Sequence, residues 1–200
     1  MNKDDVLDYW FGELDADGLP TSSREKLWFG ASPAMDAEIR ERFAALHQQA
    51  ADGELEHWTE TPLGRLALIL LLDQFSRNLF RGQAQAFAYD EKALALCKEG
   101  IKKEEDRQLA VAHRLFFYMP LQHSEQLEVQ RLGERLLAQW QASLSGAARD
   151  RVAEGLRFQQ AHLEIIDSFG RFPHRNAALG RESSEDEARY LAKNAPRFGQ

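Results

Sequence analysis

The sequence contains a single cysteine, and this scarcity excludes several kinds of site. Cys97 cannot form an intramolecular disulfide, and a cysteine-based zinc cluster needs more than one sulfur ligand. Cys97 follows Leu94, Ala95 and Leu96 in a stretch of strong helix formers. We therefore predict a buried core thiol and not a nucleophile.

Long apolar stretches are also missing. The apolar run Leu66–Leu72 has 7 residues, whereas a membrane-spanning helix needs about 20. The first residues, MNKDDVLDYWFG, are acidic and lack the apolar region of a signal peptide. We therefore expect a cytoplasmic protein with no membrane partner.

Lysine is scarce as well. Of the 25 Lys and Arg residues only 7 are Lys and 18 are Arg, and the formal net charge is −7. This balance argues against general nucleic-acid binding, which depends on basic patches, so we expect no nucleic-acid partner. Arginine is the residue of choice for bidentate contacts with carboxylates and phosphates. Its excess allows locally basic pockets in an acidic protein.

No stretch alternates convincingly between polar and apolar residues, and none is rich in Val, Ile and Thr. Hydrophobic residues recur instead at helical spacing. The predicted helices cover about residues 4–11, 33–53, 62–81, 86–100, 106–119, 124–140, 147–169 and 184–193. Short connections between them imply antiparallel neighbours. We therefore predict one all-α domain over residues 1–200, made of stacked antiparallel helix hairpins.

One helix has the rhythm of a tetratricopeptide repeat. In Ala86-x-x-Tyr89-x-x-x-Ala93-Leu94, small and aromatic residues alternate as they do in such repeats. This favours a tetratricopeptide-repeat-like α/α superhelix. We find no clean 34-residue repeat, so any such relation is degenerate.

The segment Leu63–Gly82 is the centre of the predicted fold. Thr61 and Pro62 form a good helix start, and Leu66–Leu72 is apolar on every side, as in a buried helix. The helix then ends in a polar cluster. At about 100° per residue its members share one face: Asp73, Gln74, Arg77, Asn78 and Arg81.

Two interpretations of this cluster stay open. Asp73 and Arg77 can form an i,i+4 ion pair that fastens the helix to its neighbours, or the cluster can hold a ligand. Arg81 has no second acid on the same short face, which tilts the balance slightly towards a ligand site.

A second polar stretch, HRLFFYMPLQHSE, covers residues 113–125. It places Arg114, Tyr118, His123 and Glu125 around a helix that we expect to end at Pro120. Ser124 is the expected N-cap of the following helix, and a carboxylate in its first turn is favoured by the helix dipole. Capping is therefore the simpler interpretation here.

The third stretch, FGRFPHRN, covers residues 169–176. It carries Arg171, His174, Arg175 and Asn176 in a loop, and loops held by a scaffold are where binding groups concentrate. The alternative is that these arginines bind helix C-terminal carbonyls and acidic partners. We favour function slightly.

A metal centre is not expected. His123, His162 and His174 with a nearby acid would supply suitable ligands, but no HExxH or comparable spacing is present. We predict that His162 is a core residue, and that the protein has neither a metal nor a cofactor. No G-x-S-x-G motif and no phosphate-binding glycine loop is present either.

Together these motifs resemble a known family. DQFSRNLFRG, FFYMPLQHSE and FGRFPHRNAALGR resemble the signatures of the bacterial domain of unknown function 924 family, and WFG near the start also fits. The resemblance covers essentially the whole chain, implies an all-α fold similar to tetratricopeptide-repeat proteins, and brings no reaction. Ser76 and Leu163 depart from it, standing where we expect proline and arginine. The motif positions are Asp73, Gln74, Arg77, Asn78, Arg81, Tyr118, Pro120, His123, Ser124, Glu125, Arg171, Pro173, His174, Arg175 and Asn176.

Our leading hypothesis is a binding module for an anion. The ligand would be a peptide carboxylate, a phosphorylated metabolite or an organic acid, gripped bidentately by arginines. Replacing Arg175 by Ala should then abolish binding with little change in melting temperature. The candidate ligand-binding residues are Asp73, Gln74, Arg77, Asn78, Arg81, His123, Arg171, His174, Arg175 and Asn176.

Two other functions stay open. One is a hydrolase or lyase acting on an anionic substrate, with His123 or His174 as the general acid/base. The other is a scaffold for protein partners in which the polar clusters are purely structural. The sequence leaves the oligomeric state open.

Overall fold

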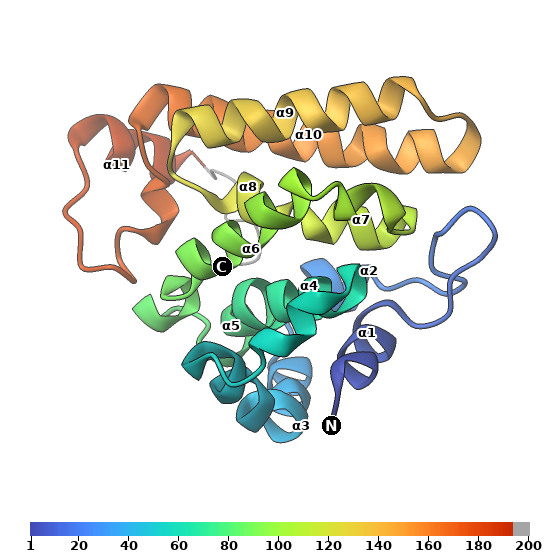
Figure 1. Ribbon diagram of the computed structural model, residues 1–200. Helices are drawn as coiled ribbons and strands as arrows, with labels where there is room; N and C mark the ends of the chain where they lie inside the picture. The colour runs from blue at the N-terminus through green and yellow to red at the C-terminus, as the bar shows by residue number, and fades with distance from the viewer. Residues whose placement is uncertain (194–200) are drawn as a thin grey trace.

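A computed structural model describes residues 1–193 of the protein, and it consists of helices and the loops between them (Figure 1). Within that range there is no β-strand, only an isolated bridge between Leu14 and Pro20. The predicted all-α class is confirmed. The tetratricopeptide-like superhelix and the single domain over residues 1–200 stay predictions, and residues 194–200 of that domain lie outside the described part.

The helices form three levels in Figure 1. α9 and α10 lie side by side at the top, α6, α7 and α8 lie below them, and α1 to α5 form the lowest level. The bounds are α1 Lys3–Phe11, α2 Glu25–Phe29, α3 Pro33–Asp52, α4 Pro62–Ile69, α5 Ser76–Leu79, α6 Asp90–Lys102, α7 Val111–Phe117, α8 Met119–His123, α9 Leu127–Ala142, α10 Gly146–Phe169 and α11 Glu185–Ala192. Between residues 1 and 193, no helix is long and apolar enough to cross a membrane.

The central helix is buried as the sequence predicts. Thr61 caps α4 by accepting a hydrogen bond from the Gly64 N–H at 3.1 Å, and every side chain of Leu66–Leu72 is buried. Cys97 is also fully buried in this core, and burial raises the pKa of its thiol. The core thiol and the core helix are therefore both confirmed.

The polar end of this helix departs from α-helical geometry. Leu70–Phe75 forms a π-helical segment that joins α4 to α5. A π-helical turn accommodates an extra residue, and such turns occur frequently at functional sites. Asp73 lies within it and is completely buried. The regular spacing predicted that the five polar residues share one α-helical face. Because the segment is π-helical up to Phe75, they do not.

Pro120 does not end a helix. It lies in the first turn of α8, where the missing N–H of proline costs no hydrogen bond. The chain therefore makes one more helical turn and places His123 at its end. Because of this turn, α9 begins at Leu127 and not at Ser124, whose hydroxyl accepts a hydrogen bond from the Gln126 N–H at 3.2 Å.

The helix ends elsewhere follow the sequence signals. Gly53 and Gly170 adopt left-handed backbone conformations just after α3 and α10. Ser184 and Glu187 form a capping box at the start of α11, at the predicted start of that helix. The predicted helix over residues 86–100 is shorter than expected, because a 3₁₀ turn, Ala84–Phe87, comes before α6.

Candidate functional site

A cavity of about 370 Å³ lies among α2, the end of the central helix, α7, α8 and α10. Ligand pockets in proteins have volumes of about 300–1,000 Å³, so this cavity has room for a small molecule. It is the site to which the first two polar clusters contribute.

One side of the cavity is aromatic. The rings of Trp28 and Phe116 have centroids 4.8 Å apart, and Phe29 is stacked on Phe158 with centroids 6.2 Å apart. Phe29 and Phe158 are 45% and 43% exposed. Exposed aromatic side chains that also line the cavity mark its open side.

The other side is polar and comes from three helical segments. The central helix, α8 and α10 contribute amide, guanidinium, imidazole and carboxylate groups. These polar lining residues are Gln74, Arg77, Asn78, Arg81, Gln122, His123, Arg151, Glu154 and His162, and Glu25 of α2 adds a second carboxylate.

His123 and Asp73 form the innermost polar pair. The Nδ1 atom of His123 lies 2.7 Å from Oδ1 of Asp73. Burial alone would raise the pKa of the Asp73 carboxyl, but Arg77, 3.2 Å away, and His123 outweigh this effect and hold that pKa below its usual value. Burial lowers the pKa of His123, which Asp73 only partly offsets. The pair is therefore a carboxylate and a neutral imidazole.

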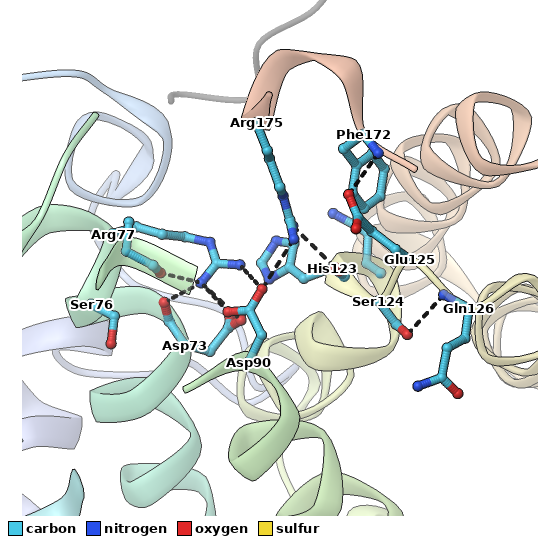
Figure 2. A network of polar contacts seen from close by, with 12 residues as sticks. Asp73, Ser76, Arg77, Asp90, His123, Ser124, Glu125, Gln126, Phe172 and Arg175 are labelled. Carbon is cyan, nitrogen blue, oxygen red and sulfur yellow. Dashed lines mark hydrogen bonds and ion pairs between the residues drawn. The ribbon is translucent and has the colours of Figure 1, made fainter. Parts of the chain in front are cut away.

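The contacts of Asp73 and His123 continue into a closed ring, which Figure 2 shows. Arg77 donates to both carboxylate oxygens of Asp90 at 3.0 Å each. Arg175 donates to the same carboxylate at 3.2 Å and to the main-chain oxygen of His123 at 3.0 Å. The ring thus runs from the imidazole of His123 through Asp73, Arg77, Asp90 and Arg175 back to the backbone of His123. It fixes this residue at both its side chain and its main chain.

Arg175 is a buried member of this ring. Its guanidinium carbon lies 4.6 Å from the ring centroids of both Phe87 and Phe172, and the residue is only 6% exposed. Burial lowers the pKa of Arg175 to about 10, so the group stays charged at neutral pH. Arg175 binds the main-chain oxygen of His123 and does not line the cavity.

Arg81 has an acidic partner from another helix. Asp36, in the first turn of α3, accepts from Nε and Nη2 of Arg81 at 2.7 and 2.9 Å, and from the amide of Asn78 at 2.9 Å. Burial would raise the pKa of Asp36, but the hydrogen bonds from Arg81 and Asn78 lower it overall. The sequence argument that Arg81 lacks an acid holds only for its own helix face.

The third cluster is not brought to the cavity. Arg171 binds both carboxylate oxygens of Glu187 at 2.6 and 2.8 Å, and the amide of Asn176 donates to Ser183 at 3.1 Å. His174 is half-buried, with its ring 5.4 Å from that of Phe172. The contact of Arg171 with Glu187 ties the loop over residues 170–184 to α11, and the other contacts lie within this loop.

Comparisons with known proteins bear on the whole chain. The family model described as "Bacterial protein of unknown function (DUF924)" matches residues 6–195. The chain belongs to the DUF924 family. A solved structure of a protein of unknown function from Agrobacterium tumefaciens is similar, with 34% identity, a TM-score of 0.80, and coverage of 96% of this chain and 97% of that chain. Among curated proteins, no match to the chain is found.

Several residues of the site in this DUF924 member were missed by sequence reasoning. Trp28, Phe29 and Phe158 line the cavity but are not among the predicted site residues, because aromatic residues look the same in the sequence whether they line a core or a cavity. Asp36 and Asp90 lie in the first turns of α3 and α6. Acids in a first turn have an ordinary explanation in the helix dipole, so no local signal distinguishes them as partners of distant arginines.

The two histidines of the cavity have defined tautomers. Nδ1 of His162 lies 2.7 Å from the carbonyl oxygen of Phe158, which can only accept, so Nδ1 carries the proton. Nδ1 of His123 likewise faces a carboxylate. Burial lowers the pKa of His162 to about 3, so both rings are neutral and each Nε2 atom is an acceptor.

Metal binding has no support in the described geometry. Within residues 1–193, no three His, Cys, Asp or Glu side chains lie close enough together to hold a metal ion. His123 and His162 have ring centroids 6.2 Å apart. Nε2 of His123 can instead accept a hydrogen bond from a ligand or from water.

Proposed function

We propose that the protein binds a small carboxylic acid with an apolar body, or an ester of such an acid, in the cavity. The observation that carries the proposal is the meeting of an aromatic wall and a polar wall in one 370 Å³ space. Ligand sites combine mainly apolar walls with a few placed polar groups in this way.

The apolar body of the ligand would lie against Trp28, Phe116 and Leu115, with Phe29 and Phe158 at the opening. Burying apolar ligand surface contributes about 25 cal/mol per Å². The polar end group would meet the amides of Asn78 and Gln122 and the guanidinium of Arg81.

The charge of the walls favours a single carboxyl or ester group over a phosphorylated compound. Arg81 is paired with Asp36, Arg77 with Asp73 and Asp90, and Arg151 with Glu154. Each cationic side chain on the wall is therefore balanced by a carboxylate. A doubly charged phosphate would enter without a surplus of positive charge to offset its desolvation.

A thermal-shift titration with octanoate and octyl phosphate tests this proposal. A ligand at 100 times its dissociation constant stabilises the folded state by about 2.7 kcal/mol. We expect octanoate to raise the melting temperature and octyl phosphate to have a smaller effect. Absence of any shift with octanoate and related acids would contradict the proposal.

Replacing Phe158 by Ala should weaken octanoate binding about tenfold, since about 1.4 kcal/mol of contact free energy corresponds to that factor. The exposed ring supports little of the core, so the melting temperature of the free protein should change little. Leu63→Ala is the matched control, because Leu63 is 39% exposed and lies away from the cavity. Equal affinities in the two variants would place the ligand elsewhere.

A further inference from the structure

We propose that His123 is a general base that activates water in the cavity, so that the protein hydrolyses an ester of the small acid described above. This inference rests on the proposed function and deepens it. It starts from the closed ring of hydrogen bonds around His123.

The ring directs the basic nitrogen of His123. Asp73 binds Nδ1 at 2.7 Å and accepts the proton there, which leaves Nε2 as the lone-pair acceptor. His123 lines the cavity, whereas Asp73 is completely buried behind it. A carboxylate in this position fixes the tautomer and stabilises the imidazolium that forms when Nε2 takes a proton.

The other members of the ring hold this pair in place. Arg77 and Arg175 both donate hydrogen bonds to the carboxylate of Asp90, and Arg175 also binds the main-chain oxygen of His123 at 3.0 Å. Asp90 and Arg175 do not line the cavity, so they are positioning residues. Three other segments of the chain thus hold His123, Asp73 at its imidazole and Arg175 at its main chain, and such support is what a catalytic group requires.

The lining of the cavity favours water as the nucleophile. Among the lining residues that the structure describes, there is no Ser, Thr, Cys or Lys, and the two lining carboxylates are Glu25 and Glu154, of which Glu154 is paired with Arg151. A histidine base without a neighbouring nucleophilic side chain acts on water or directly on the substrate. An ester is a substrate with which water reacts under such a base.

In the first step, the water oxygen forms a bond to the ester carbonyl carbon. One water proton moves to Nε2 of His123, and the carbonyl π electrons move to the carbonyl oxygen. Arg81 and the amide of Gln122, both on the wall, can stabilise this oxyanion. In the second step the carbonyl re-forms, the C–O bond to the alcohol breaks, and the departing oxygen takes the proton from Nε2. The products are the carboxylic acid and the alcohol.

Hydrolysis of 4-nitrophenyl octanoate by the full-length protein tests the proposal. His123→Asn places an amide donor near the position of Nδ1, so the buried Asp73 keeps a partner while the base at Nε2 is lost. We expect kcat to fall by about 10²–10⁴-fold, the usual contribution of a general base, while octanoate still binds. His57→Asn, at an exposed histidine that does not line the cavity, should keep the wild-type rate and controls for contaminating esterases.

The pH profile of the wild-type protein is a second readout that does not depend on the variant's folding. Burial lowers the pKa of His123 below its usual value of 6.5, so kcat should persist below pH 6.5 and fall at lower pH as Nε2 is protonated. An organophosphorus reagent specific for serine nucleophiles should leave the rate unchanged.

The outcomes separate the two proposals. Octanoate binding without hydrolysis of any 4-nitrophenyl ester overturns the hydrolase and leaves the binding function standing. Hydrolysis that survives in His123→Asn, or that the organophosphorus reagent abolishes, also overturns the role of His123. Failure of both octanoate and the ester to bind overturns both proposals.

Discussion

Arg175 shows how this protein keeps a charge in its interior. Its guanidinium is sandwiched between Phe87 and Phe172 and donates to Asp90 and to the backbone of His123. The flat guanidinium group suits such a stacked site better than an ammonium group would. Removing it leaves Asp90 with one cationic partner and leaves the His123 carbonyl oxygen without this donor.

We therefore expect Arg175→Ala to destabilise the protein by about 3 kcal/mol, the usual cost of breaking a buried ion pair. For a domain of this size, that corresponds to a fall in melting temperature of about 6–12 °C. This replaces the expectation from sequence that the melting temperature would barely change. Differential scanning calorimetry measures it.

Arg131→Ala is the comparison, since the Arg131 side chain is 47% exposed and its ion pair with Glu128 lies at the surface. Exposed pairs contribute about 0–1 kcal/mol. If both variants melted at the same temperature, Arg175 would not be the buried support that its contacts indicate.

The same residues show what sequence can and cannot predict about a site. The sequence predicted that Asp73, Gln74, Arg77, Asn78 and Arg81 belong together, because polar groups at the end of an apolar helix are unusual, and all but Asp73 line the cavity. His123, a candidate from a separate stretch, lines it too. The sequence could not predict that Asp36 pairs with Arg81, since 45 residues separate them. Whether these groups bind a ligand stays a prediction.

Helix ends were predictable where a local interaction sets them. Thr61, Gly170 and the Ser184–Glu187 capping box each act through the neighbouring turn alone, and the helices that they bound begin or end close to the predicted residues. Pro120 was ambiguous because proline both follows helices and starts them. The π-helical segment Leu70–Phe75 had no sequence signal, since it depends on how the central helix packs against its neighbours.

Close packing between helices reverses the usual stabilising effect of a glycine-to-alanine substitution at Gly100. Replacing glycine by alanine inside a helix normally stabilises by up to about 1 kcal/mol. At Gly100 in α6, a Cβ atom would lie 2.4 Å from the ring of Phe117 and 2.8 Å from Arg65. Both neighbours are buried and have no open space to move into.

Gly100→Ala should therefore destabilise the protein by about 1–3 kcal/mol, the cost of overpacking a core. Urea denaturation measures the change. Lys98→Ala, at an exposed position of the same helix, should change the free energy of unfolding by about 0.5 kcal/mol or less. A stabilised Gly100→Ala protein would mean that α6 and α7 can separate at little cost.

The whole molecule should lose stability in mild acid, because several buried or half-buried histidines are neutral. Burial lowers the pKa to about 4 for His47 and His113, and to about 3 for His162 and His174. In the unfolded chain these groups titrate near pH 6.5. Between about pH 6.5 and 4 the unfolded state thus binds protons that the folded state does not, so stability decreases as pH falls.

Each such histidine contributes a slope of up to about 1.4 kcal/mol per pH unit. Urea denaturation at pH 7, 6 and 5 should show a decreasing free energy of unfolding, before the carboxylates with lowered pKa values begin to titrate. His113→Gln should reduce this slope, whereas His57→Gln should not, since His57 is exposed. A free energy of unfolding that is constant from pH 7 to 5 would contradict the prediction.

The closed ring around His123 also has a consequence for the order in which the protein matures during synthesis. Its contacts join residues 50, 52 and 85 positions apart in sequence. A ribosome adds about 5–20 residues per second, so Arg175 emerges about 4–17 s after Asp90. During that interval the nascent chain can bury its central helix. Asp90 can then pair with Arg77 but not with Arg175, and the main-chain oxygen of His123 lacks its hydrogen bond from Arg175. The ring of contacts that holds His123 would therefore be completed only near the end of translation, as a late step that follows collapse of the core.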